Sequence, residues 1–103
     1  MLRRIESQHF QALLKHTTQL HLPDGQVLDV RVESVSENPR GRIPESPRMP
    51  FSVALTSLAP SDFVHGICAI ELADHGRLEG VFVSRVPALG RNPELAYLDV
   101  VFN

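Results

Sequence analysis

The sequence predicts an all-β fold with one short N-terminal helix. Over the last two-thirds of the chain, apolar and polar residues alternate in short runs, and turn-forming residues separate these runs. Both features are typical of antiparallel strands that bury one face. The predicted strands are Gln19–Leu22, Val27–Val35, Phe51–Leu58, Ile67–Leu72, Leu78–Val86 and Leu95–Phe102.

The number of strands indicates how they pack. Six strands of this length exceed what one open sheet can shield on one side, and closure into a barrel also removes the exposed edges. We therefore expect a six-stranded antiparallel barrel, with a two-layer β-sandwich as the alternative. The 103 residues fit a single β domain over residues 1–103, with the helix in 1–16 and the barrel in 17–103.

The N-terminal segment predicts a short helix that ends near Lys15. Ser7 can cap its start, and Phe10, Leu13 and Leu14 recur near helical spacing. A helix of this length does not persist in isolation. We therefore expect the three apolar side chains to pack against the sheet, where the helix closes one end of the barrel.

Turns and changes of phase predict the irregular positions. The segment Pro23-Asp24-Gly25-Gln26 is a strong hairpin turn. Val35 falls out of phase with the preceding inward residues, so a bulge is expected near Ser34. In the crossing after the third strand, Ser61 is expected to cap one helical turn. Gly76 is expected in the left-handed conformation of the second hairpin turn.

The strand that starts at Leu78 has two interpretations. Leu78 and Phe82 lie on one face of a regular strand, and Val81 and Val83 lie on the other. Either both faces are covered, or a bulge near Gly80 changes which residues point inward. The sequence leaves both interpretations open.

The longest loop is the candidate contact region. Glu37–Met49 contains three prolines and a glycine, which exclude a regular helix or strand. Long loops in compact domains are often functional, and arginines bind carboxylates or phosphates well. The candidate partner-contact residues are Arg40, Arg42, Ile43, Arg48 and Met49. The simpler interpretation is a solvated loop whose arginines pair with Glu37 and Glu45.

Outward-facing residues suggest a contact between copies of the chain and argue against nucleic acid. Val81, Val83 and Val101 are expected to form an outward row of apolar side chains. This row would either make the contact between copies of the chain in a homo-oligomer or pack under the helix. Phe63 and Tyr97 are expected to be exposed, whereas the phenylalanines at 10, 51, 82 and 102 point inward. Few exposed aromatics and a formal charge of −2 do not indicate a nucleic-acid surface.

No residue pattern predicts catalysis, a metal site or a cofactor, so we assign no catalytic or metal-binding residues. The five histidines form no His-x-His or His-Glu-x-x-His pattern, and no serine nucleophile motif is present. Cys68 alternates with Ile70 and Leu72, which predicts a buried structural thiol and not a nucleophile. We expect that the protein is not an enzyme.

The cysteine content and the apolar runs predict a cytoplasmic protein. One cysteine cannot form an intramolecular disulfide and fits a reducing compartment. Met1–Glu6 lacks the apolar run that follows the charged start of a signal peptide. The apolar runs are also too short to cross a membrane, so no membrane partner is expected.

Several core and turn segments together resemble a known family. They are Phe10-Gln11-Ala12-Leu13-Leu14, Pro50-Phe51-Ser52-Val53, Gly66 before a strand, Gly76 in a hairpin, and Val100-Val101-Phe102-Asn103. With these segments, nearly the whole chain resembles a family of small bacterial all-β domains of unknown function, sometimes encoded near phage-tail-collar-like proteins. The resemblance implies an assembly or accessory role and transfers no catalytic residue. The chain departs from the family in its longer proline-rich loop and in Cys68, where an aromatic is common.

The expected function is therefore a non-enzymatic interaction or accessory module of a bacterial assembly of phage-tail-like type, with a protein partner. Contacts are expected from the Glu37–Met49 loop or from the outward face of the last strand. The alternative is a small-ligand-binding β-barrel, which an interior cavity above about 300 Å³ would favour. An enzyme would require titratable groups that converge in a cleft.

Overall fold

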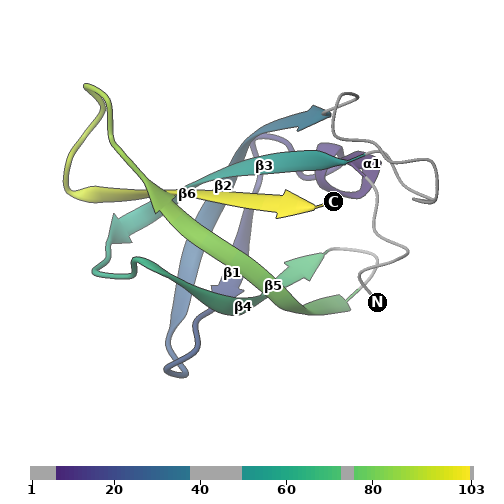
Figure 1. The fold of residues 1–103 in the computed structure, drawn as a ribbon, viewed down its shortest axis with the longest axis horizontal. Helices are drawn as coiled ribbons and strands as arrows, with labels where there is room; N and C mark the ends of the chain where they lie inside the picture. Colours follow the sequence, from purple (N-terminus) through teal and green to yellow (C-terminus); the bar gives the residue numbers. More distant parts are fainter. Residues whose placement is uncertain (1–6, 38–49, 73–75, 103) are drawn as a thin grey trace.

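The chain folds as a closed antiparallel β-barrel with one short helix at its N-terminal side (Figure 1). The computed structural model describes residues 7–37, 50–72 and 76–102. Its elements are α1 (Ser7–Gln11), β1 (Thr17–His21), β2 (Val27–Glu37), β3 (Phe51–Pro60), β4 (His65–Leu72), β5 (Gly76–Val86) and β6 (Leu95–Phe102). The strand order around the barrel is β1-β2-β3-β6-β5-β4. The predicted barrel is confirmed, and the sandwich alternative is wrong.

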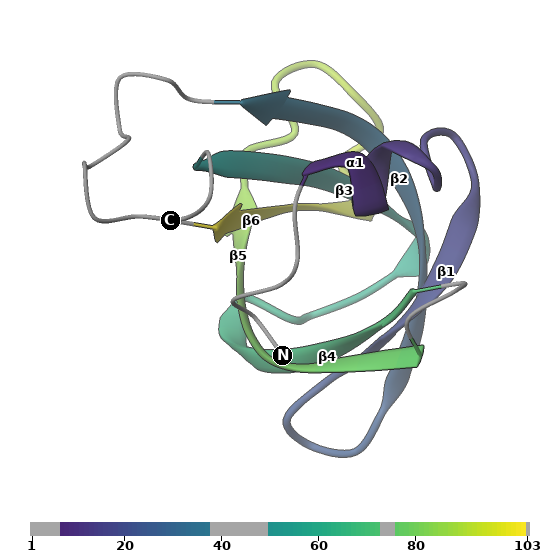
Figure 2. The same ribbon diagram turned by 90° about the vertical axis from the view of Figure 1, so that its right-hand side faces the viewer.

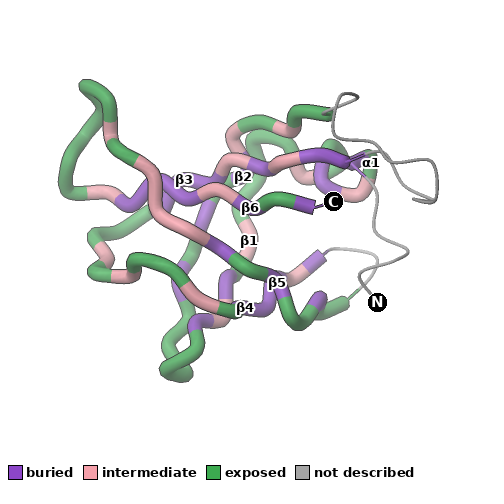
Figure 3. The backbone as a smooth tube through the Cα atoms, viewed as in Figure 1, coloured by how far each residue is buried: buried purple, intermediate pink, exposed green. Residues whose placement is uncertain are grey.

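The barrel interior is filled by alternate side chains of its strands. Along β2, buried and exposed residues alternate from Val27 to Val32, as Figure 3 shows. Val30, Val53 and Val83 have no exposed surface. Burial of one such side chain contributes roughly 1.5–3 kcal/mol relative to its exposure, so the period-two pattern supplies most of the stabilising core. No helix among the described residues has the length and apolar character needed to cross a membrane.

A bulge in β2 changes the phase of the strand as predicted. Val32 pairs with Leu55 and Ser34 pairs with Ala54, which leaves Glu33 without a register partner on β3. The extra residue turns Val35 toward the core, where it packs partly buried.

A second bulge in β5 decides between the two interpretations of that strand. Cys68 pairs with Val81 and Ile70 pairs with Leu78, so β5 has one more residue than β4 between these pairs. Gly80 lies in this interval with a φ of 73°, a left-handed conformation that side chains with a Cβ rarely adopt. The bulge near Gly80 is therefore confirmed.

The β5 bulge overturns two of the predicted orientations. Val81 and Val83 are buried, so the predicted outward row of Val81, Val83 and Val101 is wrong. Phe82 was predicted inward and is 52% exposed. The reason is that the extra residue puts Leu78, Val81 and Val83 on the same inner face, which leaves Phe82 on the outer face.

The helix is shorter than predicted because the chain turns before Lys15. The N–H groups of Leu13 and Leu14 donate to carbonyls three residues earlier, which tightens the helix into turns after Gln11. Lys15 has a φ of 66°, and its N–H donates to the carbonyl of Val32 over 2.7 Å. Leu14 is 40% exposed, so its predicted packing against the sheet is wrong, whereas Leu13 packs partly buried.

Three phenylalanine rings close the end of the barrel that carries α1. Figure 2 views this end, where α1 lies beside β2 and β3. Phe10 is fully buried, and its ring centroid lies 6.0 Å from Phe51 and 5.3 Å from Phe102. Ser7 does not act as the predicted cap, because it lies within α1 and its hydroxyl donates to Glu37 over 2.8 Å. This bond fastens α1 to the end of β2.

The turns match their predictions except at Ser61. In the first turn the Asp24 carboxylate accepts the N–H of Gln26 over 3.0 Å, and Gly25 has a φ of 92°. Gly76 has a φ of 68°, as predicted. Ser61 caps no helical turn, because residues 61–64 are not helical and its hydroxyl accepts the N–H of Phe63 over 3.2 Å.

The two ends of the barrel carry different segments (Figure 1). We call the end with α1 and the C-terminal end of β6 the helix end. Glu37 and Pro50, which flank segment 38–49, also lie there. The β1–β2, β3–β4 and β5–β6 connections lie toward the opposite end, which we call the loop end.

Candidate functional site

The five predicted contact residues belong to segment 38–49, which lies outside the described residues. They are Arg40, Arg42, Ile43, Arg48 and Met49. The candidate surfaces of the described residues are therefore built from the strands and from the connections at the loop end.

A row of exposed apolar side chains crosses the outer face of β4, β5 and β6. Ile67 and Phe82 are register partners on neighbouring strands and are 58% and 52% exposed. Val83 pairs with Val100, so the adjoining residues Phe82 and Val101 both face outward. Val101 is 60% exposed. We call Ile67, Phe82 and Val101 the apolar row.

The apolar row has a polar neighbour at one side. The His65 ring lies 6.2 Å from the Phe82 ring, and the two planes are tilted by 40°. Sequence reasoning identified Val101 on the outer face of the last strand but missed Ile67 and Phe82 as surface residues. The signal that could have found Phe82 was Gly80, because a glycine in a strand interior often marks a bulge.

A hollow of about 630 Å³ opens at the loop end, between the β1–β2 turn and the β3–β4 crossing. Its lining residues are Leu22, Asp24, Gln26, Val27, Leu28, Ala59, Pro60, Ser61, Asp62 and Phe63. Leu22 and Leu28 are buried members of the core, so they add little to the accessible lining, which is mostly polar. Asp24 and Asp62 are exposed, and neither forms an ion pair with a described residue. The hollow therefore combines a mostly polar lining with negative charge.

One arginine holds the wall of the hollow in place. The Arg85 guanidinium donates to the carbonyl of Ser61 over 2.7 Å and to that of Phe63 over 3.2 Å. The Arg85 N–H donates to the carbonyl of Val64 over 2.7 Å. The two guanidinium bonds are charge-assisted and therefore stronger than neutral ones. Together the three bonds hold the β3–β4 crossing in place, although it has no regular secondary structure.

The aromatic residues predicted to be exposed are largely covered. Tyr97 is only 6% exposed, and the Arg91 guanidinium lies 3.8 Å from its ring centre. Phe63 is half-buried and packs against the core. The exposed aromatic side chain on the outer strands is Phe82 instead.

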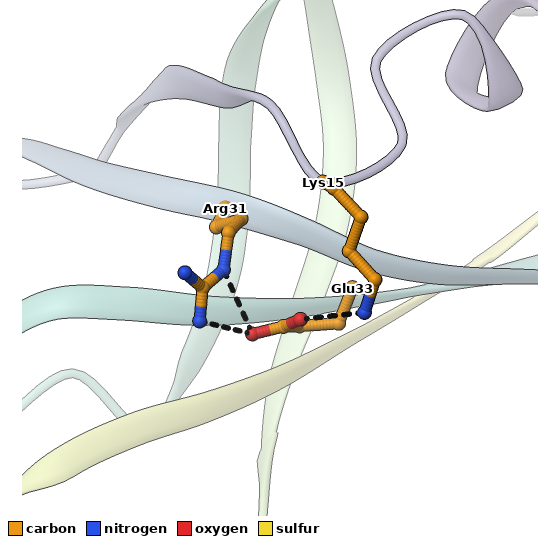
Figure 4. A network of polar contacts seen from close by, with 3 residues as sticks. All are labelled: Lys15, Arg31 and Glu33. Carbon is orange, nitrogen blue, oxygen red and sulfur yellow. Dashed lines mark hydrogen bonds and ion pairs between the residues drawn. The ribbon is translucent and has the colours of Figure 1, made fainter.

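A polar network around Glu33 stabilises the β2 bulge (Figure 4). Glu33 accepts hydrogen bonds from Lys15 over 3.3 Å and from the Arg31 guanidinium over 3.0 and 3.1 Å. Burial acts to raise the pKa of Glu33, but hydrogen bonds from Thr56, Arg31 and Lys15 outweigh it and hold the pKa below 4.5. Through Lys15, the network links the residues that follow α1 to β2. Its role is therefore structural.

The titratable groups of the described residues do not converge into a catalytic or metal site. His21 lies 2.8 Å from Glu71, at the point where β1 pairs with β4. Asp99 is half-buried on β6, and burial raises its pKa. No group of three histidine, cysteine or acidic residues that could hold a metal occurs among the described residues.

Cys68 is buried, as the alternation in β4 predicts. Its side chain is 3% exposed, and burial raises the pKa of the thiol from 9.0 to about 11. A thiol in this environment stays protonated near neutral pH and is a poor nucleophile.

Cys68 is expected to make the protein less stable at alkaline pH. The folded state keeps the thiol proton to a higher pH than the unfolded state, so unfolded chains lose it first above pH 9.0. The free energy of unfolding should therefore fall between about pH 9 and about pH 11 through this group. Denaturant unfolding of wild type and Cys68→Ala over this range measures the difference. Parallel curves for the two proteins would contradict the assignment.

Comparison with known proteins gives a family without an assigned activity. No curated protein and no solved structure matches the chain. A family model described as a domain of unknown function (DUF6916) matches residues 5–102, which include α1 and all six strands. Because the match covers almost the entire sequence, the chain belongs to this family of uncharacterised domains.

Proposed function

We propose that this domain is a non-enzymatic protein-binding module that acts in the cytoplasm as an accessory to a larger bacterial assembly. The apolar row on β4, β5 and β6 is its partner-binding surface. The resemblance to domains encoded near phage-tail-collar-like proteins makes a phage-tail-like assembly the first to test. The single buried thiol, Cys68, fits a reducing compartment.

The observation that carries this proposal is the exposure of three large apolar side chains on adjacent strands. Contiguous apolar surface of this kind marks interaction sites in soluble proteins. Aromatic residues such as Phe82 are enriched at the centres of interfaces. The residues of the apolar row belong to paired strands of a closed barrel, so their backbone is already ordered before a partner binds. The entropy lost on binding is therefore small.

Charge introduced into the apolar row tests the proposal. Purified products of the neighbouring genes are titrated against the wild-type protein and against Phe82→Glu. We expect one product to bind and Phe82→Glu to weaken that binding by about 30-fold or more, as expected for loss of a central anchor worth about 2 kcal/mol.

Leu89→Glu is the matched control, because Leu89 is 84% exposed but lies in the β5–β6 connection. It should leave the affinity unchanged. The proposal is wrong if no neighbouring product binds, or if Phe82→Glu binds as tightly as the control.

A small-ligand-binding barrel is the second candidate, and the hollow at the loop end favours it. Its volume of about 630 Å³ falls within the range of ligand pockets. The barrel interior itself is filled by side chains, so the ligand would sit at the mouth of the barrel, above Leu22 and Leu28. Native mass spectrometry of the protein purified from cells detects such a ligand as added mass.

A further inference from the structure

We propose that the partner of the apolar row presents a lysine or arginine between two apolar side chains, and that this basic group pairs with Asp99. The inference rests on the proposed function, because it takes the apolar row as the binding surface and adds the chemistry of the partner. It depends on the position of Asp99, on the lack of a described partner for its carboxylate, and on a second apolar area beyond it.

Asp99 lies next to the apolar row on the outer face of the barrel. Alternate residues of a strand share a face, so Asp99 and Val101 both point outward from β6. Asp99 is the register partner of Ser84 on β5, which follows Phe82 by two residues on the outer face of that strand. Side chains two residues apart on one face of a strand are separated by about 7 Å. The carboxylate therefore adjoins the apolar row on the side of Phe82 and Val101.

The Asp99 carboxylate has no hydrogen-bond or ion-pair partner among the described residues. Its register partners, Ser84 on β5 and Ala54 on β3, are uncharged. Arg85 at the end of β5 and Arg91 in the β5–β6 connection each bind two backbone carbonyls instead. Within the described part of the chain, nothing therefore neutralises this charge.

A half-buried carboxylate without a partner is costly to the folded protein. Asp99 is only partly exposed, and burial raises its pKa, which means that its charged form is disfavoured at this position. Desolvation of a charge costs free energy unless an opposite charge or a hydrogen bond compensates for it. A cationic group of a bound partner would supply that compensation.

A second apolar area lies on the other side of Asp99. Tyr97 precedes Asp99 by two residues on β6, and it lines an open groove of about 390 Å³ together with its register partner Val86. Val64 and Leu95 extend the apolar lining of this groove. The outer surface of β5 and β6 therefore changes from apolar to acidic and back to apolar, in steps of about 7 Å.

This order of surface chemistry selects the partner. A purely apolar partner would cover the Asp99 carboxylate without compensating its charge, and an acidic partner would be repelled. A lysine or arginine places its charged head on Asp99 and its alkyl stem against neighbouring apolar surface. Steps of about 7 Å equal the spacing of alternate side chains in an extended chain. A peptide with apolar, basic and apolar residues at positions i, i+2 and i+4 would therefore contact all three areas.

Selected peptides provide the test. A phage-displayed library of random short peptides is selected on immobilised wild-type protein. We expect the enriched peptides to share a lysine or arginine with an apolar residue two positions away on each side. The most enriched sequence is then synthesised in two forms, one with the basic residue and one with norleucine in its place. Both forms are titrated against wild type, Asp99→Asn, Asp29→Asn and Phe82→Ala.

We expect Asp99→Asn to weaken binding of the basic peptide at least about tenfold and to leave the norleucine peptide unaffected. Asp29→Asn is the matched control, because Asp29 is an exposed aspartate on the outer face of β2, away from this surface. It should bind both peptides like wild type. Phe82→Ala should weaken both peptides, because it removes the apolar anchor and changes no charge.

The outcomes separate this inference from the proposed function. If Asp99→Asn binds both peptides as tightly as wild type while Phe82→Ala weakens them, the inference is overturned and the apolar row remains a binding surface. If the selection enriches no peptide, or if the peptides bind Phe82→Ala as tightly as wild type, both are contradicted.

Two further measurements address the other roles of this surface. Thermal melts of Asp99→Asn should show a melting temperature equal to or above that of wild type, because the substitution removes an uncompensated charge. A lower melting temperature would give Asp99 a structural partner and overturn the inference. Sedimentation velocity of wild type should show single chains. Self-association that Phe82→Ala abolishes would mean that a second copy covers the row, which also overturns the inference.

Discussion

Phe10→Ala is expected to lower the free energy of unfolding by about 3–5 kcal/mol. Phe10 is fully buried, and its ring packs against Phe51 and Phe102, whose own ring centroids are 4.6 Å apart. Removal of the ring leaves a cavity at the helix end of the barrel. It also removes the main apolar contact of α1, a helix of five residues that has little stability of its own. Chemical denaturation monitored by circular dichroism measures the loss.

Phe82→Ala is the matched control for this experiment. It deletes the same ring from a position that is 52% exposed, so it should cost less than about 1 kcal/mol. Similar losses for the two variants would mean that Phe10 does not close the barrel. Since Phe82 is also the proposed binding anchor, the pair separates a residue needed for folding from one available for binding.

Ser57→Ala is expected to cost about 1–3 kcal/mol, although it removes a single oxygen. Ser57 is fully buried, and its hydroxyl accepts the N–H of Ala96 over 2.7 Å. The bond lies where the pairing of β3 with β6 is interrupted, between Thr56 and Pro60. Without the hydroxyl, the buried N–H of Ala96 has no acceptor there. Hydrogen exchange of the Ala96 amide, together with denaturant unfolding, reports the change.

Ser52→Ala on the same strand provides the comparison. Ser52 is half-buried and lies within regular pairing to β2 and β6, where backbone bonds are complete without a side chain. Its replacement should change stability by less than about 0.5 kcal/mol. The role assigned to Ser57 fails if its variant and the Ser52 variant are equally stable.

The positions of the strands were predictable because each strand buries one face. In β2, β3 and β6 the residues expected to face inward are buried, among them Val30, Val53 and Val100. The bulge beside Ser34 was predictable for the same reason, since Val35 breaks that alternation. The extent of the helix was not, because Lys15 adopts a left-handed conformation and bonds to Val32, a residue distant in sequence.

The candidate surfaces were predictable only in part. Val101 was expected on the outer face of the last strand, and it is exposed there. Ile67 and Phe82 join it through the register of β4 with β5, which depends on the bulge at Gly80. The hollow combines residues from the β1–β2 turn and the β3–β4 crossing, which are distant in sequence: Asp24 and Asp62 are 38 residues apart. The predicted contact segment itself lies outside the described residues.

The sequence by itself determined that six strands with alternating side chains bury one common face, because that alternation is a local property of each strand. The tertiary structure decided how the strands are ordered and how their outer faces meet. Its register brought Ile67 and Phe82 together, and its closure set Asp24 near the β3–β4 crossing. The physical reason is that burial selects residues by hydrophobicity at each position, whereas an outer surface depends on pairings between strands that no single stretch of sequence contains.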